Sequence, residues 1–223
     1  MNICAFYNKI DDPYFDQEYE KIVDIWKKSW YDNGWNPIVL NLEDSKKHPK
    51  FEEYYKKIDT YPSIHRKIYL DLCYLKWLAI ANRGGWFTDI DMININFKPQ
   101  SFTSESVSCS FNVCPSTIYM TKENYEEKIV DTIFNYDFPD GDVYDKHPIH
   151  GDVDKSKYTS DMLILFNKRV IDKFDKNLEN QFDCTYDIDY SKYSILHFHG
   201  GCLQANIKPR SEIMLQYLKT KKI

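Results

Sequence analysis

Short apolar runs alternate with helix-like patterns along the N-terminal part of the chain. Residues 2–7 indicate a first strand, and apolar residues at helical spacing run from about Phe15 to a stop at Gly34. Residues 37–40 form a second short apolar run. Strands that alternate with helices in this way are typical of α/β sheets with parallel members. The sequence therefore predicts an α/β fold.

A long helix with one apolar stripe is expected over residues 64–83, followed by a strand at 86–90. Gly84 and Gly85 separate the two, because glycine allows the tight turn that ends a helix. After this point the order of elements is less regular. The remaining patterns predict strands at 107–113, 117–120, 162–166 and 194–198, and helices at 51–58, 122–136, 169–180 and 211–221.

The composition fits one soluble domain of 223 residues, of which 43% are hydrophobic and 28% charged. The net charge of −5 disfavours nucleic-acid binding, since no basic stripe is long enough to follow a phosphate backbone. No apolar segment reaches the ~20 residues that a membrane-spanning helix needs, and the N-terminal pattern is not that of a signal peptide. Six cysteines without a C-x-x-C pair favour a reducing, cytoplasmic setting.

Two carboxylates, Asp89 and Asp91, stand at the end of the strand that follows the double glycine. On a strand, residues i and i+2 share a face, so the two α-carbons would lie roughly 6.5–7 Å apart. A divalent cation is the natural partner of two such carboxylates. Ligands of open α/β sheets also bind at the carboxyl ends of strands. A solvated acidic strand end is the simpler alternative.

The run at 75–91, LKWLAIANRGGWFTDID, resembles the D-x-D region of nucleotide-sugar glycosyltransferases. It is most similar to glycosyltransferase family 32 and to the glucosyltransferase domains of large bacterial toxins. The resemblance implies a single GT-A-like (Rossmann-like) domain, in which a mixed central sheet is flanked by helices. Residues 1–98 would bind the nucleotide sugar, and residues 99–223 would face the acceptor. Lys76 falls where the family has Arg and would contact the donor, whereas Cys73 replaces the family's usual Asp.

A second segment, SILHFHG at 194–200, resembles the H-x-x-G-x-x-K-P-W element of glycosyltransferase family 8. This resemblance implies that His197 is a third metal ligand beside the two carboxylates, and that Lys208 binds the diphosphate. Lys208 follows at a longer spacing than in the family, and Arg210 replaces the family's Trp. The set of ligands suits Mn²⁺ or Mg²⁺. Ordinary strand histidines, or a zinc-binding pair of His197 and His199, are the alternatives.

The expected roles within the site differ from residue to residue. Asp91 is expected to bind the metal directly and to be essential for catalysis, while Asp89 would bind either the metal or the ribose. Tyr7 and Asn8 end the first strand, where this class of fold generally holds the nucleotide base, although they could simply mark a strand end. Arg66, near the start of the long helix, could reach the donor.

Asp161 follows a long segment, 137–158, that is rich in Asp, Gly, Pro and His. Long segments of this kind are often lids or binding loops. The alternative is a surface loop without a function. Asp161 is the candidate acid near the sugars, or else an ordinary acid at the start of the next element. Both family resemblances imply retention at the anomeric carbon, whereas Asp161 acting as a base would allow inversion.

Together these patterns predict a metal-dependent glycosyltransferase that moves a sugar from a nucleoside diphosphate, UDP or GDP, to a glycan or another hydroxyl acceptor. A metal-dependent phosphoesterase is the rival enzyme, because such enzymes also gather Asp and His around divalent ions. An inactive sugar- or nucleotide-binding module is the rival without catalysis. The sequence has no G-x-G-x-x-G, Walker or G-x-S-x-G pattern, which weakens the dehydrogenase, NTPase and esterase interpretations.

Overall fold

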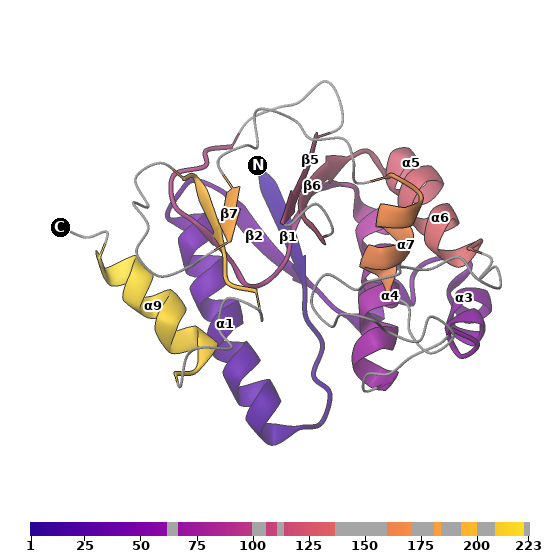
Figure 1. Cartoon of the computed structure of the whole chain (residues 1–223), viewed down its shortest axis with the longest axis horizontal. Helices are drawn as coiled ribbons and strands as arrows, with labels where there is room; N and C mark the ends of the chain where they lie inside the picture. Colours follow the sequence, from indigo (N-terminus) through magenta and orange to yellow (C-terminus); the bar gives the residue numbers. More distant parts are fainter. Residues whose placement is uncertain are drawn as a thin grey trace.

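The computed structural model describes residues 1–61, 67–99, 106–110, 114–136, 160–170, 181–183, 193–199 and 208–220. Strands and helices alternate in the N-terminal part, and helices lie on both sides of the strands (Figure 1). The predicted α/β class, with a mixed sheet flanked by helices, is therefore confirmed.

Five strands form the larger sheet: β1 (Asn2–Phe6), β2 (Asn36–Leu40), β3 (Gly85–Thr88), β5 (Ser106–Ser110) and β6 (Cys114–Met120). Their spatial order is β2-β1-β3-β6-β5. β1 pairs in parallel with both β2 and β3, whereas β6 pairs antiparallel with β3 and β5. The chain passes from β1 to β2 on one side and returns to β3 on the other side. A topological switch point therefore lies between β1 and β3.

Successive residues of the two central strands face opposite sides of the sheet, and a hydrophobic core forms on each side. Ile3, Ala5 and Trp86 belong to one core, while Cys4 and Phe87 belong to the other. β1 and β3 thus contact a core on each face, which explains the consecutive apolar residues within them.

Helix α1 (Pro13–Tyr31), which the sequence predicts, covers the first core. It begins where the Asp12 carboxylate accepts a hydrogen bond from a backbone N–H of the first turn. It ends before Gly34, whose φ of +90° is a left-handed conformation that favours glycine. The helix is tied to β3 by Trp26, whose Nε1 donates to Thr88 Oγ1 at 2.9 Å.

The opposite core is covered by the helices between β2 and β3 and by those that follow β6 (Figure 1). The long helix is the central member of this layer, and it leads directly into β3. These helices are α2 (Leu42–Ser45), α3 (Phe51–Ile58), α4 (Lys67–Arg83), α5 (Lys122–Asn124), the π-helical turn η1 (Tyr125–Val130), α6 (Asp131–Phe134) and α7 (Asp161–Asn167).

One predicted strand is wrong. The run at 162–166 belongs to helix α7, which begins where the Ser160 hydroxyl accepts a hydrogen bond from the Leu163 N–H at 3.2 Å. A short apolar run does not by itself distinguish a strand from a buried helix. The segment 137–158 lies outside the described residues, as does the predicted helix at 169–180 apart from its first two residues.

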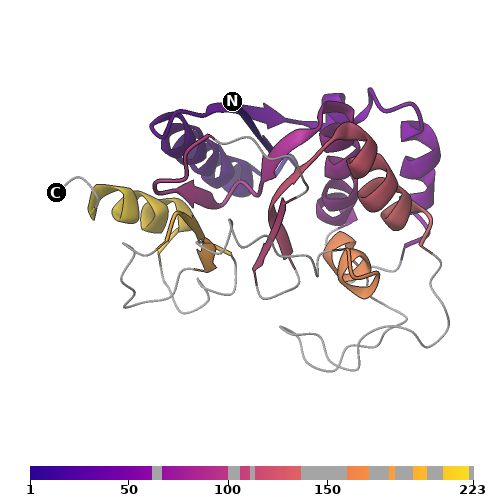
Figure 2. The same cartoon turned by 90° about the horizontal axis from the view of Figure 1, so that it is seen from above.

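A second sheet has three strands: β4 (Met92–Asn94), β7 (Gln181–Asp183) and β8 (Ile195–His197). Their order is β4-β8-β7, and β4 pairs antiparallel with β8. Helix α9 (Arg210–Thr220) packs against α1 beside this sheet (Figure 2). The chain therefore passes from the larger sheet to the smaller one in the three residues between β3 and β4.

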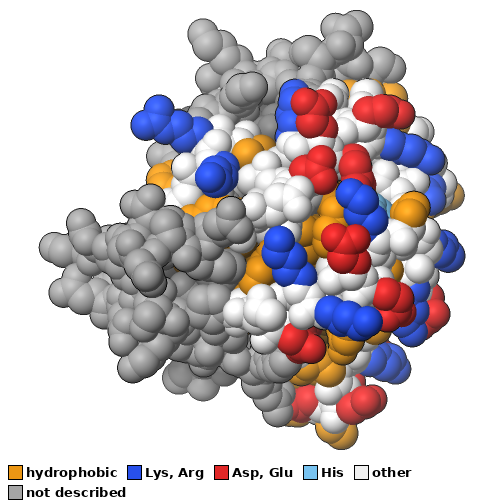
Figure 3. All heavy atoms as spheres, turned by 90° about the vertical axis from the view of Figure 1, so that its right-hand side faces the viewer, with side chains coloured by type: hydrophobic (Ala, Val, Ile, Leu, Met, Phe, Trp, Pro, Cys, Tyr) orange, Lys and Arg blue, Asp and Glu red, His pale blue; other side chains and the backbone are white. Residues whose placement is uncertain are grey.

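Charged side chains of both signs are interspersed on the face that carries α3 (Figure 3). Ion pairs at helical spacing join Lys46 to Glu43 and Lys47 to Asp44. No helix within the described ranges is both long and apolar enough to cross a lipid bilayer.

Candidate metal centre

The D-x-D segment lies in a turn between the two sheets. β3 ends at Thr88, Asp89 to Asp91 form the connection, and β4 begins at Met92. Two backbone hydrogen bonds of Asp89 help to hold this turn: its N–H donates to the Ser116 carbonyl at 2.9 Å, and its carbonyl accepts from the Met92 N–H at 3.3 Å. The predicted strand at 86–90 is thus too long. The two carboxylates are brought together by the turn, and not by a shared strand face.

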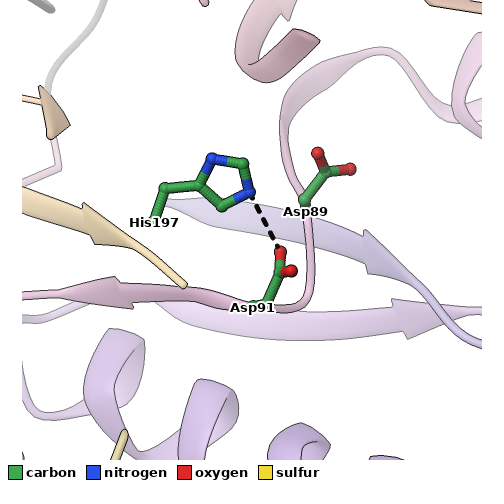
Figure 4. Close-up of side chains that lie close together, drawn as sticks. All are labelled: Asp89, Asp91 and His197. Carbon is green, nitrogen blue, oxygen red and sulfur yellow. Dashed lines mark ion pairs between the residues drawn. The ribbon is translucent and has the colours of Figure 1, made fainter. Parts of the chain in front are cut away.

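His197 reaches the same turn through strand pairing. It lies opposite Met92 in the β4–β8 ladder, and the N–H of Phe198 donates to the Asp91 carbonyl at 2.9 Å. His197 Nε2 lies 3.4 Å from Asp91 Oδ1 (Figure 4). One ligand atom from each of Asp89, Asp91 and His197 lies within 4.8 Å of the other two. A metal ion could bind to this group of three side chains.

The chemistry of the group fits a divalent metal ion. His197 is buried, and both carboxylates are largely shielded from solvent. Two carboxylate oxygens and one imidazole nitrogen fill three positions of a coordination sphere, which leaves the other positions to water or a substrate. The geometry thus supports a metal site at the three predicted ligands, whereas the identity of the metal stays a prediction.

Lys76 bridges this group to Asp161. Its Nζ lies 3.1 Å from Asp161 Oδ2 and 3.8 Å from Asp89 Oδ1. Trp77 Nε1 donates to the same Asp161 oxygen at 2.8 Å, and Asp161 is almost completely buried. Burial lowers the pKa of Lys76, but the Asp161 and Asp89 carboxylates outweigh this effect and raise the pKa overall. Lys76 is therefore a permanent positive charge between two acidic side chains.

Burial raises the pKa of both metal-group carboxylates, but their neighbours differ. For Asp91, His197 and Arg210 outweigh burial and lower the pKa to about 2. For Asp89, burial has the largest effect, Lys76 lowers the pKa and Asp91 raises it, and the net direction is upward. A cation bound between the two carboxylates would favour the charged form of both.

Two side chains at the site were missed by the sequence-based prediction. Arg210 Nη1 lies 2.8 Å from Asp91 Oδ2, and the Cys114 thiol donates to Asp89 Oδ2 at 3.4 Å. Burial raises the pKa of Cys114 well above its usual range, so its thiol keeps the proton that it donates. In the sequence, Arg210 could be noticed only because it follows Lys208 by two residues. At that position the family has Trp, so the arginine departs from the family pattern.

For the other residues predicted to bind the donor, the described structure gives no hydrogen bond or ion pair with the metal group. Tyr7 and Asn8 follow β1 at the switch point, and the Asn8 side chain accepts a hydrogen bond from the Leu42 N–H at 3.3 Å. Lys208 is exposed, and Arg66 lies outside the described residues. The donor-binding roles of these four residues stay predictions.

His199 lies close to the metal group without belonging to it. Its ring centroid is 5.3 Å from that of His197. The group of side chains that could share an ion includes His197 and does not include His199. The zinc-pair alternative would require both rings to ligate one ion.

No family model, curated protein or solved structure matches the chain. The residues of the site and the partial sequence resemblances are therefore the basis for inferring the function.

Proposed function

We propose that the chain is a metal-dependent glycosyltransferase of the GT-A type, which transfers a sugar from a nucleoside diphosphate to a hydroxyl acceptor. One observation carries the proposal: the Asp89–Asp91–His197 group lies directly after the carboxyl end of β3. This position adjoins the switch point between β1 and β3, and open α/β sheets bind their ligands at such points. The two sequence resemblances support the same use of the same residues.

Within this proposal, Asp89, Asp91 and His197 would hold Mn²⁺ or Mg²⁺. The ion would supply positive charge that offsets the negative charge developing on a diphosphate leaving group. Lys76 adds a positive charge, largely shielded from solvent, 3.8 Å from Asp89. Tyr7 and Asn8, after β1, lie on the other side of the switch point, where the nucleotide base would bind.

Asp161 is the residue whose role decides the stereochemical outcome. Trp77 and Lys76 both contact its Oδ2 atom, so an acceptor hydroxyl would have to approach Oδ1. An inverting enzyme would use this oxygen as its base. In a retaining enzyme, as the resemblances imply, Asp161 would instead keep Lys76 in place beside the metal group.

A phosphoesterase is the less favoured alternative. Phosphoesterases with two metal ions need a larger set of ligands than one ion requires. Within the described ranges, one group of acidic, cysteine or histidine side chains lies close enough together to share an ion, and it consists of Asp89, Asp91 and His197. Such a set suits one metal ion.

A panel of UDP- and GDP-sugars incubated with the protein and Mn²⁺ tests the proposal. We expect slow release of the nucleoside diphosphate from one donor, because transferases also pass their sugar to water. The same assay with a chromogenic phosphate monoester separates the alternatives. Cleavage of the monoester without selectivity among donors would indicate a phosphoesterase, and donor binding without any release would indicate a binding module.

A further inference from the structure

Arg210 contacts the metal group from the first residue of α9. Its Nη1 lies 2.8 Å from Asp91 Oδ2, while the other oxygen, Oδ1, lies 3.4 Å from His197 Nε2. The two oxygens of Asp91 thus have different partners. One partner is a guanidinium, and the other is an imidazole of the candidate metal group.

The surroundings of Arg210 fix the direction of its side chain. Its guanidinium donates to the Tyr19 hydroxyl at 3.4 Å and lies over the Tyr19 ring, and only 20% of the side chain is exposed. The next residue, Ser211, donates to the Glu18 carboxylate through its N–H at 2.7 Å and its hydroxyl at 2.9 Å. Helix α1 therefore holds the start of α9, and with it the position of Arg210.

We propose that Arg210 is a positioning residue that makes Asp91 a one-oxygen metal ligand. By holding Oδ2, the guanidinium leaves Oδ1 to face the ion together with His197 and Asp89. The partners of metal ligands commonly fix ligand orientation in this way. This inference rests on the metal-binding part of the proposed function and does not depend on sugar transfer.

A one-oxygen Asp91 favours some metals over others. Ca²⁺ takes about six to eight oxygen ligands and often binds both oxygens of a carboxylate. Mn²⁺ accepts carboxylate and imidazole ligands in a smaller coordination sphere. With Oδ2 held by Arg210, the site should therefore select Mn²⁺ over Ca²⁺.

The test compares the full chain with its Arg210→Gln and Arg210→Lys variants, without nucleotide sugar. Mn²⁺ affinity is measured from the electron paramagnetic resonance signal of free Mn²⁺, and Ca²⁺ affinity from its displacement of bound Mn²⁺. Removal of a positive charge should help both ions alike, so the readout is the ratio of the Ca²⁺ to the Mn²⁺ dissociation constant. Lys219→Gln removes an exposed cation from the same helix and is the matched control.

We expect Arg210→Gln to lower this ratio about ten-fold, in line with the effect of outer-shell partners on metal binding. Arg210→Lys should lower it less, because lysine keeps the charge but lacks the planar fork. The control should keep the original ratio. Tighter binding of both ions at an unchanged ratio would overturn the inference, since Arg210 would then only repel the ions.

Three further outcomes are informative. If Arg210→Gln does not fold by circular dichroism, Arg210→Lys carries the test, and an unchanged ratio in that variant overturns the inference. Failure of the unaltered chain to bind Mn²⁺ overturns it as well. Metal binding without sugar transfer would leave the inference intact and would contradict only the proposed enzymatic activity.

Discussion

Lys76 balances the charge of two acidic side chains, Asp161 and Asp89, at a position largely shielded from solvent. Lys76→Met should lower the free energy of unfolding by about 3–5 kcal/mol, because removal of one partner leaves buried charge uncompensated. Adding Asp161→Asn should restore part of this loss, since the orphaned carboxylate is then neutral. Urea unfolding of the two single variants and the double variant measures the coupling. Strictly additive losses would show that the contact between Lys76 and Asp161 is energetically unimportant.

Cys4 provides a test of burial in the core that α4 covers. Burial has the largest effect on its thiol and raises the pKa from 9.0 to about 11, against the lowering influence of Arg83. Because the pKa is higher in the folded state, this thiol contributes its full stabilisation below pH 9 and loses it as the pH rises toward 11. The loss should reach about 2 kcal/mol at pH 11.

A comparison of the unaltered chain with Cys4→Ala isolates this contribution. Lysine and tyrosine side chains titrate in the same pH range in both proteins, so the difference between the two unfolding free energies is the informative quantity. We expect that difference to fall by about 2 kcal/mol between pH 8 and pH 11. A constant difference would mean that the Cys4 thiol ionises as easily in the folded protein as in the unfolded chain.

The turn from α4 into β3 determines where β3 begins, and β3 leads directly to the metal group. Gly84 and Gly85 have φ values of +68° and +88°, and both conformations disfavour residues with a Cβ atom. A Cβ at Gly84 would also approach the Lys122 backbone nitrogen at 3.0 Å and Lys122 Cγ at 2.9 Å, whereas a Cβ at Gly85 would meet nothing within 4 Å.

The two glycines therefore form a matched pair of substitutions. Gly85→Ala should cost about 1–2 kcal/mol of unfolding free energy from backbone strain alone. Gly84→Ala should cost more, because the backbone of α5 would have to shift. Urea unfolding of both variants measures the difference. Equal stabilities would show that the contact with Lys122 relaxes freely.

The elements of the N-terminal half were predictable because their signals are local. Helix α1 has an apolar stripe, a capping Asp12 and a terminal Gly34, and each agrees with the others. The run at 162–166 has no comparable set of local signals that agree with one another. It is helical because Ser160 caps its first turn and because it packs into the core that α4 covers. Short apolar runs take their structure from the surrounding packing.

The residues of the candidate site that belong to a sequence motif could be predicted. Asp89, Asp91 and His197 were all identified, although the expected strand geometry of the two carboxylates was wrong. Arg210 was missed because its contact with Asp91 depends on how α9 packs against α1, and Cys114 because it depends on the position of β6. Such contacts between distant segments leave no pattern in a single sequence.

At the scale of the whole molecule, the metal group joins the two sheets. Asp89 and Asp91 lie in the connection between β3 and β4, and His197 belongs to β8. An ion bound to all three would bind the folded chain and not the unfolded one. Mn²⁺ at about 100 times its dissociation constant should therefore raise the unfolding free energy by about 3 kcal/mol.

Two histidine variants test this stabilisation. His197→Ala should abolish the effect of Mn²⁺ on the melting temperature, while His199→Ala, which alters the neighbouring ring, should preserve most of it. Equal losses in both variants would indicate that the two histidines share the ion and would revive the zinc interpretation.

The most direct test of the proposed glycosyltransferase activity is the rate of nucleoside diphosphate release from the preferred nucleotide sugar. The rate is measured against Mn²⁺ concentration for the unaltered chain and for Asp91→Asn, after both have been shown to be folded. We predict release that depends on Mn²⁺ in the unaltered chain and a loss of at least about a hundred-fold in Asp91→Asn, because an essential metal ligand contributes several kcal/mol to transition-state stabilisation. Equal rates in the two proteins at low Mn²⁺ would contradict the account.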